Sequence, residues 1–329
     1  MSKNVTVAEM AQALMQSTGR IVITAHIRPD GDAAGAALGL CLSLRASGRQ
    51  AVCVGLAPLG DEFNFLEGLP DIIPAARYVP AEGDEMAIVD CGDFSRIAPE
   101  LLEFAKTRAH FCIDHHKSNA GFASFCLIDP AASSASELVY AVLQAGGLPL
   151  TRGVAEALWV GIVTDTGRFS YSCTSPDTLR RAAVLLEHGA RIAMINDRIY
   201  CQIALRRLRL QRRLLDSLEV IANGLISVVS LVPEDYEAEQ CSSMDSDNFV
   251  DVPRSVKGTL ISVFLRQVKP DGFVNISLRT HDPFDASQIC AEWGGGGHAY
   301  ASGATVPGDV PSVRAKVLAR LTEIVSASL

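Results

Sequence analysis

The sequence HIRPDGD, residues 26–32, places one imidazole and two carboxylates directly after the apolar run IVITA. Such a run is typical of a buried strand, and the Pro/Gly turn after it brings His26, Asp30 and Asp32 to the strand's end. Asp and His ligands without Cys suit Mn²⁺, Mg²⁺ or a similar ion. Taken alone, the stretch fits either a metal site or a turn with an aspartate cap.

Three further segments place ionisable side chains after an apolar run. VDCGD contributes Asp90 and Asp93, and GIVTDTGRFSY contributes Asp165 in a Gly/Thr-rich turn. CIDHHKSN contributes Asp114, His115 and His116. Because the carboxyl ends of parallel strands lie along one edge of an open sheet, we expect these clusters to converge in space. Carboxylates in such number repel one another unless some are protonated or cations lie among them.

A pair of divalent ions accounts for this density of ligands. Two ions about 3.5–4 Å apart activate a water molecule and hold the phosphoryl oxygens during an in-line displacement. Some single residues have simpler explanations: Asp93 fits a cap of the helix SRIAPELL, His110 a strand edge, and His188 a cation at a helix C-terminus. The joint occurrence of the four segments is what favours a metal centre.

The elements that must position these residues alternate between strand and helix in the first half of the chain. Predicted strands cover 21–25, 50–56, 86–90 and 110–114. Helical spacing is found at 4–18, 33–48, 97–108, 134–147 and 151–167, and a short helix is predicted at 61–69. This alternation predicts an α/β fold with a parallel sheet wrapped by helices.

The second half of the chain follows a different pattern. After a helix-rich stretch, the runs GLISVVSLV, GTLISVFLRQV and GFVNISLRT are predicted strands, AEWGGGGHAYASGATV a Gly-rich turn, and 311–328 an amphipathic helix. We therefore predict an N-terminal parallel-sheet domain at 1–190, a helical linker at 191–217 and a smaller α+β domain at 218–329. The basic run RRLRLQRR fits a solvated linking helix better than a nucleic-acid patch.

The glycine-rich turn of the second half has the chemistry of an anion site. Consecutive backbone N–H groups can bind an anion, and glycine lets the backbone approach a phosphate closely. Beside Arg279 and His298, the turn is interpreted as a nest for the terminal phosphate of a substrate, while Arg279 taken alone fits a solvated strand residue equally well. A clamp that holds one end of a substrate favours short substrates over long ones.

Composition bounds the class of protein. The chain has 329 residues, is 48% hydrophobic and 20% charged, and carries a formal net charge of −8, which disfavours binding to long duplex nucleic acid. Its nine cysteines contain no CxxC pair, so a disulfide framework is not expected. The N-terminal residues do not have the pattern of a signal peptide, and no apolar run reaches the length of a membrane span. We expect a reduced, cytoplasmic protein.

With these residues in place, the chain resembles the DHH phosphoesterase superfamily. HIRPDGDAAGA resembles its first motif, VDCGD the second, IDHHKSN the DHH signature, IVTDTGRFSY the fourth, and GGGGHAYASGA the motif of the DHH-associated domain. The first motif commonly ends in Gly-Ser, whereas Ala36 follows Gly35 here. Among superfamily members, the chain most resembles the nanoRNase group, which degrades short RNA and dephosphorylates 3′-phosphoadenosine 5′-phosphate.

The resemblance implies a role for each matching residue. Metal ligands would be His26, Asp30, Asp32, Asp90, His115 and Asp165, with Asp90 bridging two ions. Asp114 would be a ligand or would orient His115, and His116 would meet the scissile phosphate as a hydrogen-bond donor or general acid. Substrate contacts would come from Arg279, Gly295, Gly296, Gly297, His298 and Ser302.

We therefore predict a metal-dependent phosphoesterase with its active-site cleft between two domains. Its expected substrates are short oligoribonucleotides, 3′-phosphoadenosine 5′-phosphate, or both, and its expected cofactors are two Mn²⁺ ions, with Mg²⁺ or Co²⁺ as alternatives. The rival activities are hydrolysis of cyclic or linear dinucleotides, then a RecJ-type single-strand exonuclease or an inorganic pyrophosphatase. A non-catalytic nucleotide sensor would carry broken metal motifs, which this chain does not. A homodimer is a further prediction, from apolar helical stretches such as IYCQIALRRLRL.

Overall fold

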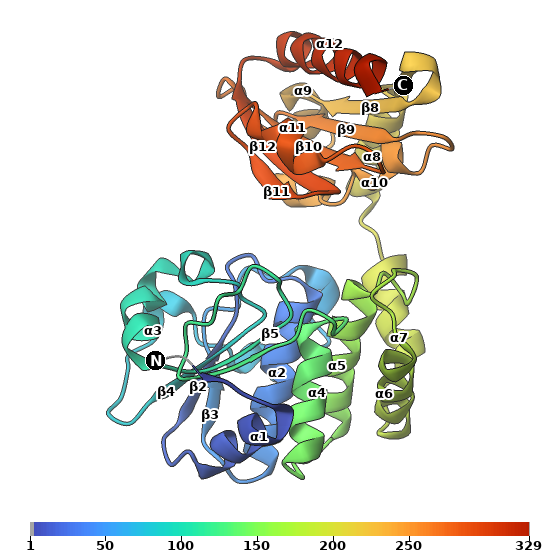
Figure 1. The fold of residues 1–329 in the computed structure, drawn as a ribbon. Helices are drawn as coiled ribbons and strands as arrows, with labels where there is room; N and C mark the ends of the chain where they lie inside the picture. Colours follow the sequence, from blue (N-terminus) through green and yellow to red (C-terminus); the bar gives the residue numbers. More distant parts are fainter. Residues whose placement is uncertain (1–2, 329) are drawn as a thin grey trace. The chain divides into compact units, whose positions relative to one another are not determined.

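The computed structural model describes residues 3–328, and the chain divides between Gln202 and Ile203 into two compact units (Figure 1). This division falls inside the stretch 191–217. That stretch is not one continuous helix: α7 (Ile192–Asn196) leads into a π turn at Asp197–Cys201, and α8 (Leu205–Asp216) begins the second unit.

The first unit is built on a parallel sheet with the strand order β1-β6-β5-β4-β2-β3. Each neighbouring pair of strands is parallel, as the alternation of strands and helices predicts. The strands are β1 (Lys3–Asn4), β2 (Ile21–Thr24), β3 (Ala51–Cys53), β4 (Glu85–Val89), β5 (Ala109–Asp114) and β6 (Phe125–Ile128). Strands β1 and β6 are not among the predicted ones, and the predicted helix at 61–69 is a 3₁₀ turn at Asp61–Phe63.

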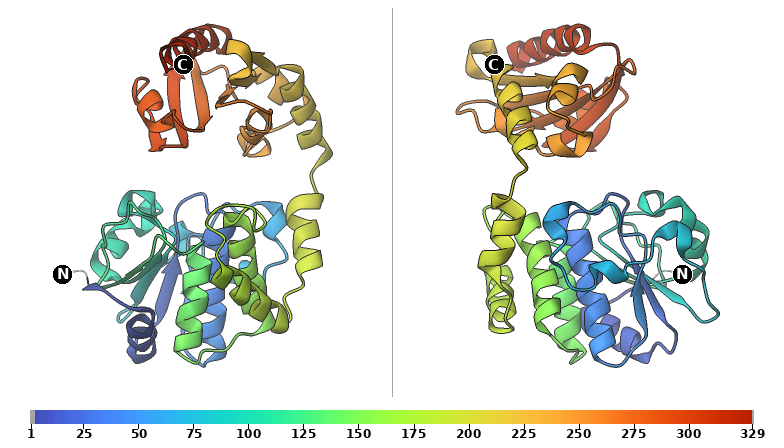
Figure 2. Two further views of the ribbon diagram at one scale, coloured as in Figure 1. Left: turned by 45° about the vertical axis from the view of Figure 1, so that its right-hand side comes forward. Right: turned by 180° about the vertical axis from the view of Figure 1, so that it is seen from behind.

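Helices cover both faces of this sheet, which explains why its central strands are mostly apolar (Figures 1 and 2). One face packs against α1, α2 and α4, with α5 behind them, and the other packs against α3. Gly35 lets α2 and α5 approach closely, since a Cβ there would lie 2.4 Å from the carbonyl oxygen of Ala157. The helices are α1 (Val7–Gln16), α2 (Gly31–Ala46), α3 (Leu102–Arg108), α4 (Ala135–Ala145), α5 (Arg152–Asp165) and α6 (Pro176–Glu187).

The second unit has a mixed sheet with the strand order β11-β12-β10-β9-β8-β7. The pair β8–β9 is parallel and the other neighbouring pairs are antiparallel. Its strands are β7 (Glu219–Ile221), β8 (Ile226–Leu231), β9 (Ile261–Arg266), β10 (Phe273–Thr280), β11 (Gly296–His298) and β12 (Ala301–Pro307). The glycine-rich segment, predicted as a turn, thus forms the hairpin β11–β12.

Two hydrophobic clusters lie on the two faces of the second sheet. One face packs against α11 (Ala286–Ala291) and α12 (Val310–Ser328). On the other face, α8 and α9 (Pro233–Ala238) cover β8 and β9. The short helix α10 (Asp251–Arg254) lies beside the same two strands. Within residues 3–328, no helix has the length and apolarity needed to cross a membrane.

Candidate metal centre and phosphoesterase site

The ionisable residues of the first unit meet at the carboxyl edge of its sheet. His26 follows β2, Asp90 follows β4, and His115 follows β5. Asp165 is the last residue of α5 rather than the end of a strand. Asp30 caps α2, and its Oδ1 accepts hydrogen bonds from the backbone N–H groups of Asp32 (3.0 Å) and Ala33 (3.1 Å).

Three overlapping groups of side chains at this edge have the spacing of metal ligands. Their members are His26, Asp30 and Asp90; Asp32, His115 and Asp165; and Asp90, His115 and His116. Within each group, the candidate ligand atoms lie within 4.8 Å of one another. All six side chains predicted as metal ligands are therefore together, and Asp90 and His115 each belong to two groups.

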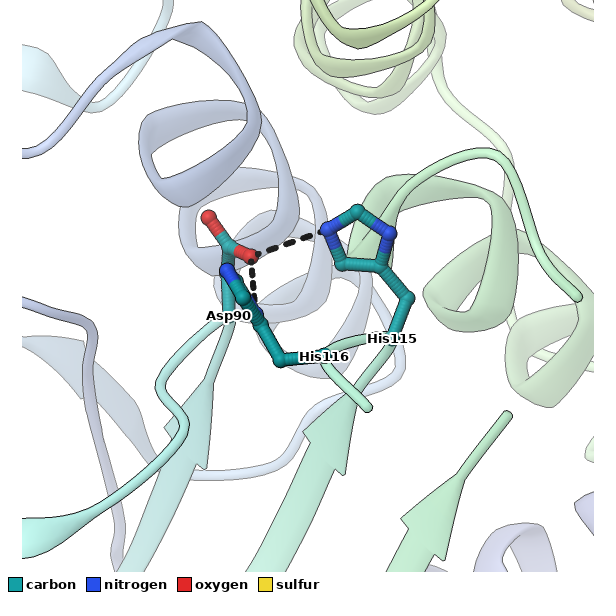
Figure 3. A group of neighbouring side chains, drawn as sticks. All are labelled: Asp90, His115 and His116. Carbon is teal, nitrogen blue, oxygen red and sulfur yellow. Dashed lines mark ion pairs between the residues drawn. The ribbon is translucent and has the colours of Figure 1, made fainter. Parts of the chain in front are cut away.

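Asp90 lies at the centre of this cluster. Its Oδ2 is 3.5 Å from Nε2 of His26. Its Oδ1 is 3.5 Å from Nε2 of His115 and 3.6 Å from Nδ1 of His116 (Figure 3). Asp90 is only 2% exposed, and its Oδ1 is buried without a hydrogen-bond partner in the described structure. A buried carboxylate oxygen is costly unless a donor or a cation satisfies it. The backbone of Asp90 has φ +50°, which stores strain of the kind found at functional sites.

Asp32 is held by the first turn of α4. Its Oδ2 accepts a hydrogen bond from the N–H of Ala135 (2.6 Å), and its Oδ1 accepts one from the N–H of Ser136 (2.9 Å). The positive end of a helix stabilises such a carboxylate. Asp32 is fully buried, and these two hydrogen bonds fix its orientation. Its Oδ2 lies 3.9 Å from Nε2 of His115.

The electrostatics of the cluster favour additional positive charge. Burial raises the pKa of Asp32 to about 7, and burial together with the charges of Asp32 and Asp90 raises the pKa of Asp165 well above its ordinary value. Burial opposes charge on His26 and His115, but their carboxylate neighbours outweigh it and raise both pKa values to about 10. Burial also opposes charge on Asp90, but its contacts with His115 and His26 hold its pKa below the ordinary range. An excess of carboxylates attracts positive charge, which bound protons or metal ions can supply.

Asp114 contacts His116 rather than the side chain of His115, which was one of its expected partners. Its Oδ1 lies 2.7 Å from Nδ1 of His116 and accepts a hydrogen bond from the backbone N–H of His115 (2.9 Å). Its Oδ2 accepts a hydrogen bond from Nδ2 of Asn119 (2.7 Å). Asp114 is fully buried and belongs to none of the three groups with ligand spacing. Its contacts instead place it to orient the imidazole of His116.

Asn119 is the last residue of the IDHHKSN segment, and no role was predicted for it. Its side chain is 8% exposed, and its Nδ2 also lies 3.2 Å from the carbonyl oxygen of Cys91, while its Oδ1 accepts a hydrogen bond from the N–H of Gly121 (2.8 Å). Asn119 thereby links the segments after β4 and β5. The signal available in the sequence was a polar residue four positions after His115, directly before Ala-Gly.

Asp93, His110 and His188 lie outside the cluster and make structural contacts. Asp93 caps the 3₁₀ turn Phe94–Arg96 and accepts a hydrogen bond from the N–H of Ser95 (2.6 Å). His110 packs its ring against Phe111 and Phe125 within the sheet. His188 is the C-cap that follows α6, and its Nδ1 lies 2.8 Å from the carbonyl oxygen of Leu150.

The predicted substrate residues of the second unit lie on the hairpin β11–β12 and on β10. Arg279 pairs with Ala301, and Ala301 pairs with His298, so Arg279 and His298 flank the same row of the sheet. The glycines differ from one another. A Cβ at Gly295 would lie 2.2 Å from the carbonyl oxygen of Gly303, and Gly297 has φ +148°. A Cβ at Gly296 would meet no atom within 4 Å, so among Gly295, Gly296 and Gly297 only Gly296 leaves open space.

Ser302 does not lie with these residues. It is 6% exposed, and its Oγ donates a hydrogen bond to the carbonyl oxygen of His298 (2.8 Å). It pairs with Leu278, whose side chain is part of the hydrophobic cluster under α11 and α12. Alternation along the strand therefore points Ser302 away from Arg279, and its place in the structure is to hold the hairpin.

Family comparisons agree with this geometry. Residues 20–162 match the DHH family, N-terminal domain, and residues 224–327 match the DHHA1 domain. A bifunctional oligoribonuclease and PAP phosphatase, NrnA, from Thermus thermophilus is 34% identical over 319 residues, which cover 95% of this chain and 93% of that protein. The chain belongs to the DHH family. It is accordingly an α/β phosphoesterase with a DHH domain followed by a DHHA1 domain.

Two further similarities extend along most of the chain. The NrnA of Bacillus subtilis, also named a bifunctional oligoribonuclease and PAP phosphatase, is 26% identical over 289 residues, covering 87% of this chain and 89% of that protein. The crystal structure of an exopolyphosphatase-related protein from Bacteroides fragilis has a TM-score of 0.88 and 28% identity, covering 96% of this chain and 95% of that one. That structure therefore shares the fold of this chain over nearly its whole length.

Proposed function

We propose that this DHH phosphoesterase hydrolyses short oligoribonucleotides to nucleoside monophosphates and converts 3′-phosphoadenosine 5′-phosphate to AMP. The observation that supports it most is the position of Asp90, which directs one carboxylate oxygen toward His26 and the other toward His115. The relatives named oligoribonuclease and PAP phosphatase, which cover nearly the whole chain, favour these substrates over others.

The donor set fits two divalent cations. His26, Asp30 and Asp90 would hold one ion, and Asp32, Asp90, His115 and Asp165 would hold the other. The buried Oδ1 of Asp90, which accepts no hydrogen bond in the described structure, is the kind of oxygen that a cation satisfies. Oxygen and imidazole ligands without thiolate favour Mn²⁺, with Mg²⁺ or Co²⁺ as alternatives. When bound, such a pair supplies a water of lowered pKa and neutralises charge on phosphate oxygens.

The residues of the chain supply the remaining chemistry. His116 donates its Nδ1–H to Asp114, which leaves Nε2 directed away from that carboxylate. From there, a protonated Nε2 can donate to a phosphate oxygen or to the departing ribose oxygen. Contact with Asp114 raises the pKa of His116 and so favours the protonated form that this role requires.

The second unit would recognise the nucleotide. The guanidinium of Arg279 and the imidazole of His298 flank one row of the sheet, and the open backbone at Gly296 adjoins it. A guanidinium is suited to binding phosphate oxygens in pairs. Binding one end of a substrate by its phosphate would favour substrates of a few nucleotides.

A hydrolysis panel with purified protein tests the proposal. With Mn²⁺ present, we expect turnover of 3′-phosphoadenosine 5′-phosphate and of RNAs of two to five nucleotides, and much slower turnover of a 24-mer. Cyclic di-AMP, linear pApA and pyrophosphate serve as competing substrates. Rapid cleavage of only pyrophosphate or of only the 24-mer would contradict the proposed substrates while leaving the metal centre in place.

A further inference from the structure

One half of a sheet face in the second unit carries side chains that are exposed or half-buried. Alternation along β10 places Phe273, Asn275, Ser277 and Arg279 on one face, while the residues between them are buried. On the same face, β8 and β9 are covered by the cluster that includes Leu210 and Leu214 of α8. The side chains on the β10 half are instead partly or fully exposed.

The neighbouring strand β12 continues this open surface. Phe273 pairs with Pro307, Asn275 with Thr305, Ser277 with Gly303, and Arg279 with Ala301. The hydrogen bond from Nδ2 of Asn275 to Oγ1 of Thr305 (2.9 Å) shows that these two side chains share the face. The side chains in the middle of this surface are small, because Gly303 is flanked by Ser277 and by Gly296 of β11. We call these four paired rows of β10 and β12 the open strip.

The two ends of the open strip differ in chemistry. Arg279 forms a cationic end beside the imidazole of His298, and Phe273, which is 52% exposed, forms an aromatic end. Six residues of an antiparallel strand span roughly 20 Å, which is longer than one nucleotide. Along β9, Arg266 closes the strip at the side, since its Nη1 is held by Oγ of Ser246 (3.2 Å) and Oδ1 of Asp247 (3.3 Å).

Proteins that bind single-stranded nucleic acid commonly combine exposed aromatic rings with cationic groups along one surface. A base stacks on the ring whatever its identity, while the cation binds the backbone. A polar amide and hydroxyl, here Asn275 and Thr305, lie between the two ends and can bind a ribose or a base edge. The chain's net charge of −8 makes a long, backbone-only interaction unfavourable.

We propose that the open strip is an extended binding site for short single-stranded RNA, with the ring of Phe273 stacking on a base distant from the phosphate held by Arg279. This inference rests on the proposed function and adds a length-dependent contact to it. A mononucleotide held at Arg279 does not reach Phe273, whereas an RNA of several nucleotides does. The strip would therefore favour oligonucleotides of a few residues over the shortest substrates.

The experiment compares kcat/KM across substrate lengths for Phe273 variants. For Phe273→Ala, we expect about a 10-fold loss on RNAs of four or five nucleotides, a loss of the size typical of one stacked base, and no change on 3′-phosphoadenosine 5′-phosphate. Phe273→Tyr should restore the wild-type dependence on length, and Phe273→Leu should not. Val220→Ala removes a different exposed apolar side chain of this unit, 44% exposed on β7, and serves as the matched control.

An abasic scan identifies the stacked base. A series of five-nucleotide RNAs would each lack the base at a different position. In the wild type, loss of the base at one position should lower kcat/KM. In Phe273→Ala, loss of the base at that same position should cause no further decrease. Equal losses on all substrates, or none on any, would overturn the open strip as an RNA site. If the wild type hydrolyses none of these substrates, the proposed function fails instead, so the two failures are distinguishable.

Discussion

The Nδ1 of His116 lies 2.7 Å from Oδ1 of Asp114, and this contact decides which ring nitrogen of His116 faces away from the buried carboxylate. Asp114 is itself fixed by Nδ2 of Asn119 at 2.7 Å. The three residues form a chain of hydrogen bonds that ends at an imidazole beside Asp90. Orientation of a histidine by a carboxylate is a recurrent device for setting its tautomer.

The first prediction concerns this carboxylate. Asp114→Asn removes the charge that orients His116 and favours its protonation, so kcat should fall by about 100-fold, a typical contribution of a positioned acid. KM should change by only a few fold, because Asp114 is buried and has no direct path to the substrate. Asp93→Asn, which alters the cap of a turn, is the matched control and should keep its activity. Equal kcat values for Asp114→Asn and wild type would show that Asp114 does not contribute to catalysis.

The second prediction concerns the shared ligand. Asp90→Ala removes a carboxylate that belongs to two of the three ligand groups, so turnover should drop to background and Mn²⁺ binding measured by calorimetry should weaken at both sites. Chelation of metal from the wild type with EDTA should have the same effect on turnover, and added Mn²⁺ should reverse it. Activity in Asp90→Ala that resembles the wild type would exclude the two-metal mechanism.

The metal cluster was the part of the molecule most readily predicted from sequence. Polar residues that end apolar runs must lie at one sheet edge once the strands are parallel, so His26, Asp90 and His115 could be placed together without knowing any distance. The partner of Asp114 could not be predicted, because adjacent residues such as His115 and His116 differ only in the direction of their side chains. The partner that Asp114 takes also depends on its own orientation, which Asn119 fixes by a hydrogen bond while contacting the carbonyl oxygen of Cys91.

The second unit was less predictable for a similar reason. The glycine-rich segment has the composition of a turn, yet it pairs in register with β10 through β12. Sequence does not reveal which face each residue takes until the register is known. Ser302 was therefore grouped with Arg279 in the sequence, although the strand directs it to the opposite face. Strand β6 was missed because its four residues are too short for a periodic pattern.

The third prediction is that metal binding releases protons. His26 and His115, with pKa values raised to about 10 by their carboxylate neighbours against the effect of burial, hold protons at neutral pH. A metal ion binds the neutral imidazole, so it must displace those protons. The apparent affinity for Mn²⁺ should therefore increase as the pH rises from about 6.5 to about 8.5.

Calorimetry measures this release directly. Titrations of Mn²⁺ in two buffers with different ionisation enthalpies, at one pH, should give different heats. His26→Gln should release about one proton fewer than the wild type. Identical heats in the two buffers would show that the imidazoles are already neutral before the metal binds.

The fourth prediction separates two adjacent glycines of the hairpin. Gly295→Ala places a Cβ 2.2 Å from the carbonyl oxygen of Gly303, so the backbone must shift and the free energy of unfolding should fall by about 1–3 kcal/mol. Gly296→Ala meets open space and should unfold at the wild-type temperature. Because its methyl group occupies the surface beside His298, Gly296→Ala should instead raise KM for 3′-phosphoadenosine 5′-phosphate. A stable Gly296→Ala variant with an unchanged KM would show that the nucleotide does not bind against the backbone at Gly296.

The fifth prediction concerns stability at the opposite edge of the first sheet. Nε of Arg20 donates to Oδ1 of Asp84 (2.9 Å) and its Nη2 to Oδ2 (2.7 Å), which ties the start of β2 to the segment before β4. Burial alone would raise the pKa of Asp84, but Arg20, Tyr78 and the N–H of Ala81 outweigh it and lower that pKa below its ordinary 3.8. Asp84→Asn should therefore lower the free energy of unfolding by about 1–3 kcal/mol at pH 7.

The sign of the pH dependence follows from the direction of this shift. A carboxylate whose pKa is lowered in the folded state stabilises the protein fully above its unfolded pKa, near 3.8, and loses that contribution as the pH falls through the lower folded value. The difference in unfolding temperature between wild type and Asp84→Asn should thus be constant above about pH 5 and narrow below about pH 4. Asp71→Asn breaks an exposed pair with Arg45, so it should change stability little at any pH. A difference for Asp84→Asn that stays constant down to about pH 3 would show that the charge of Asp84 does not contribute to stability.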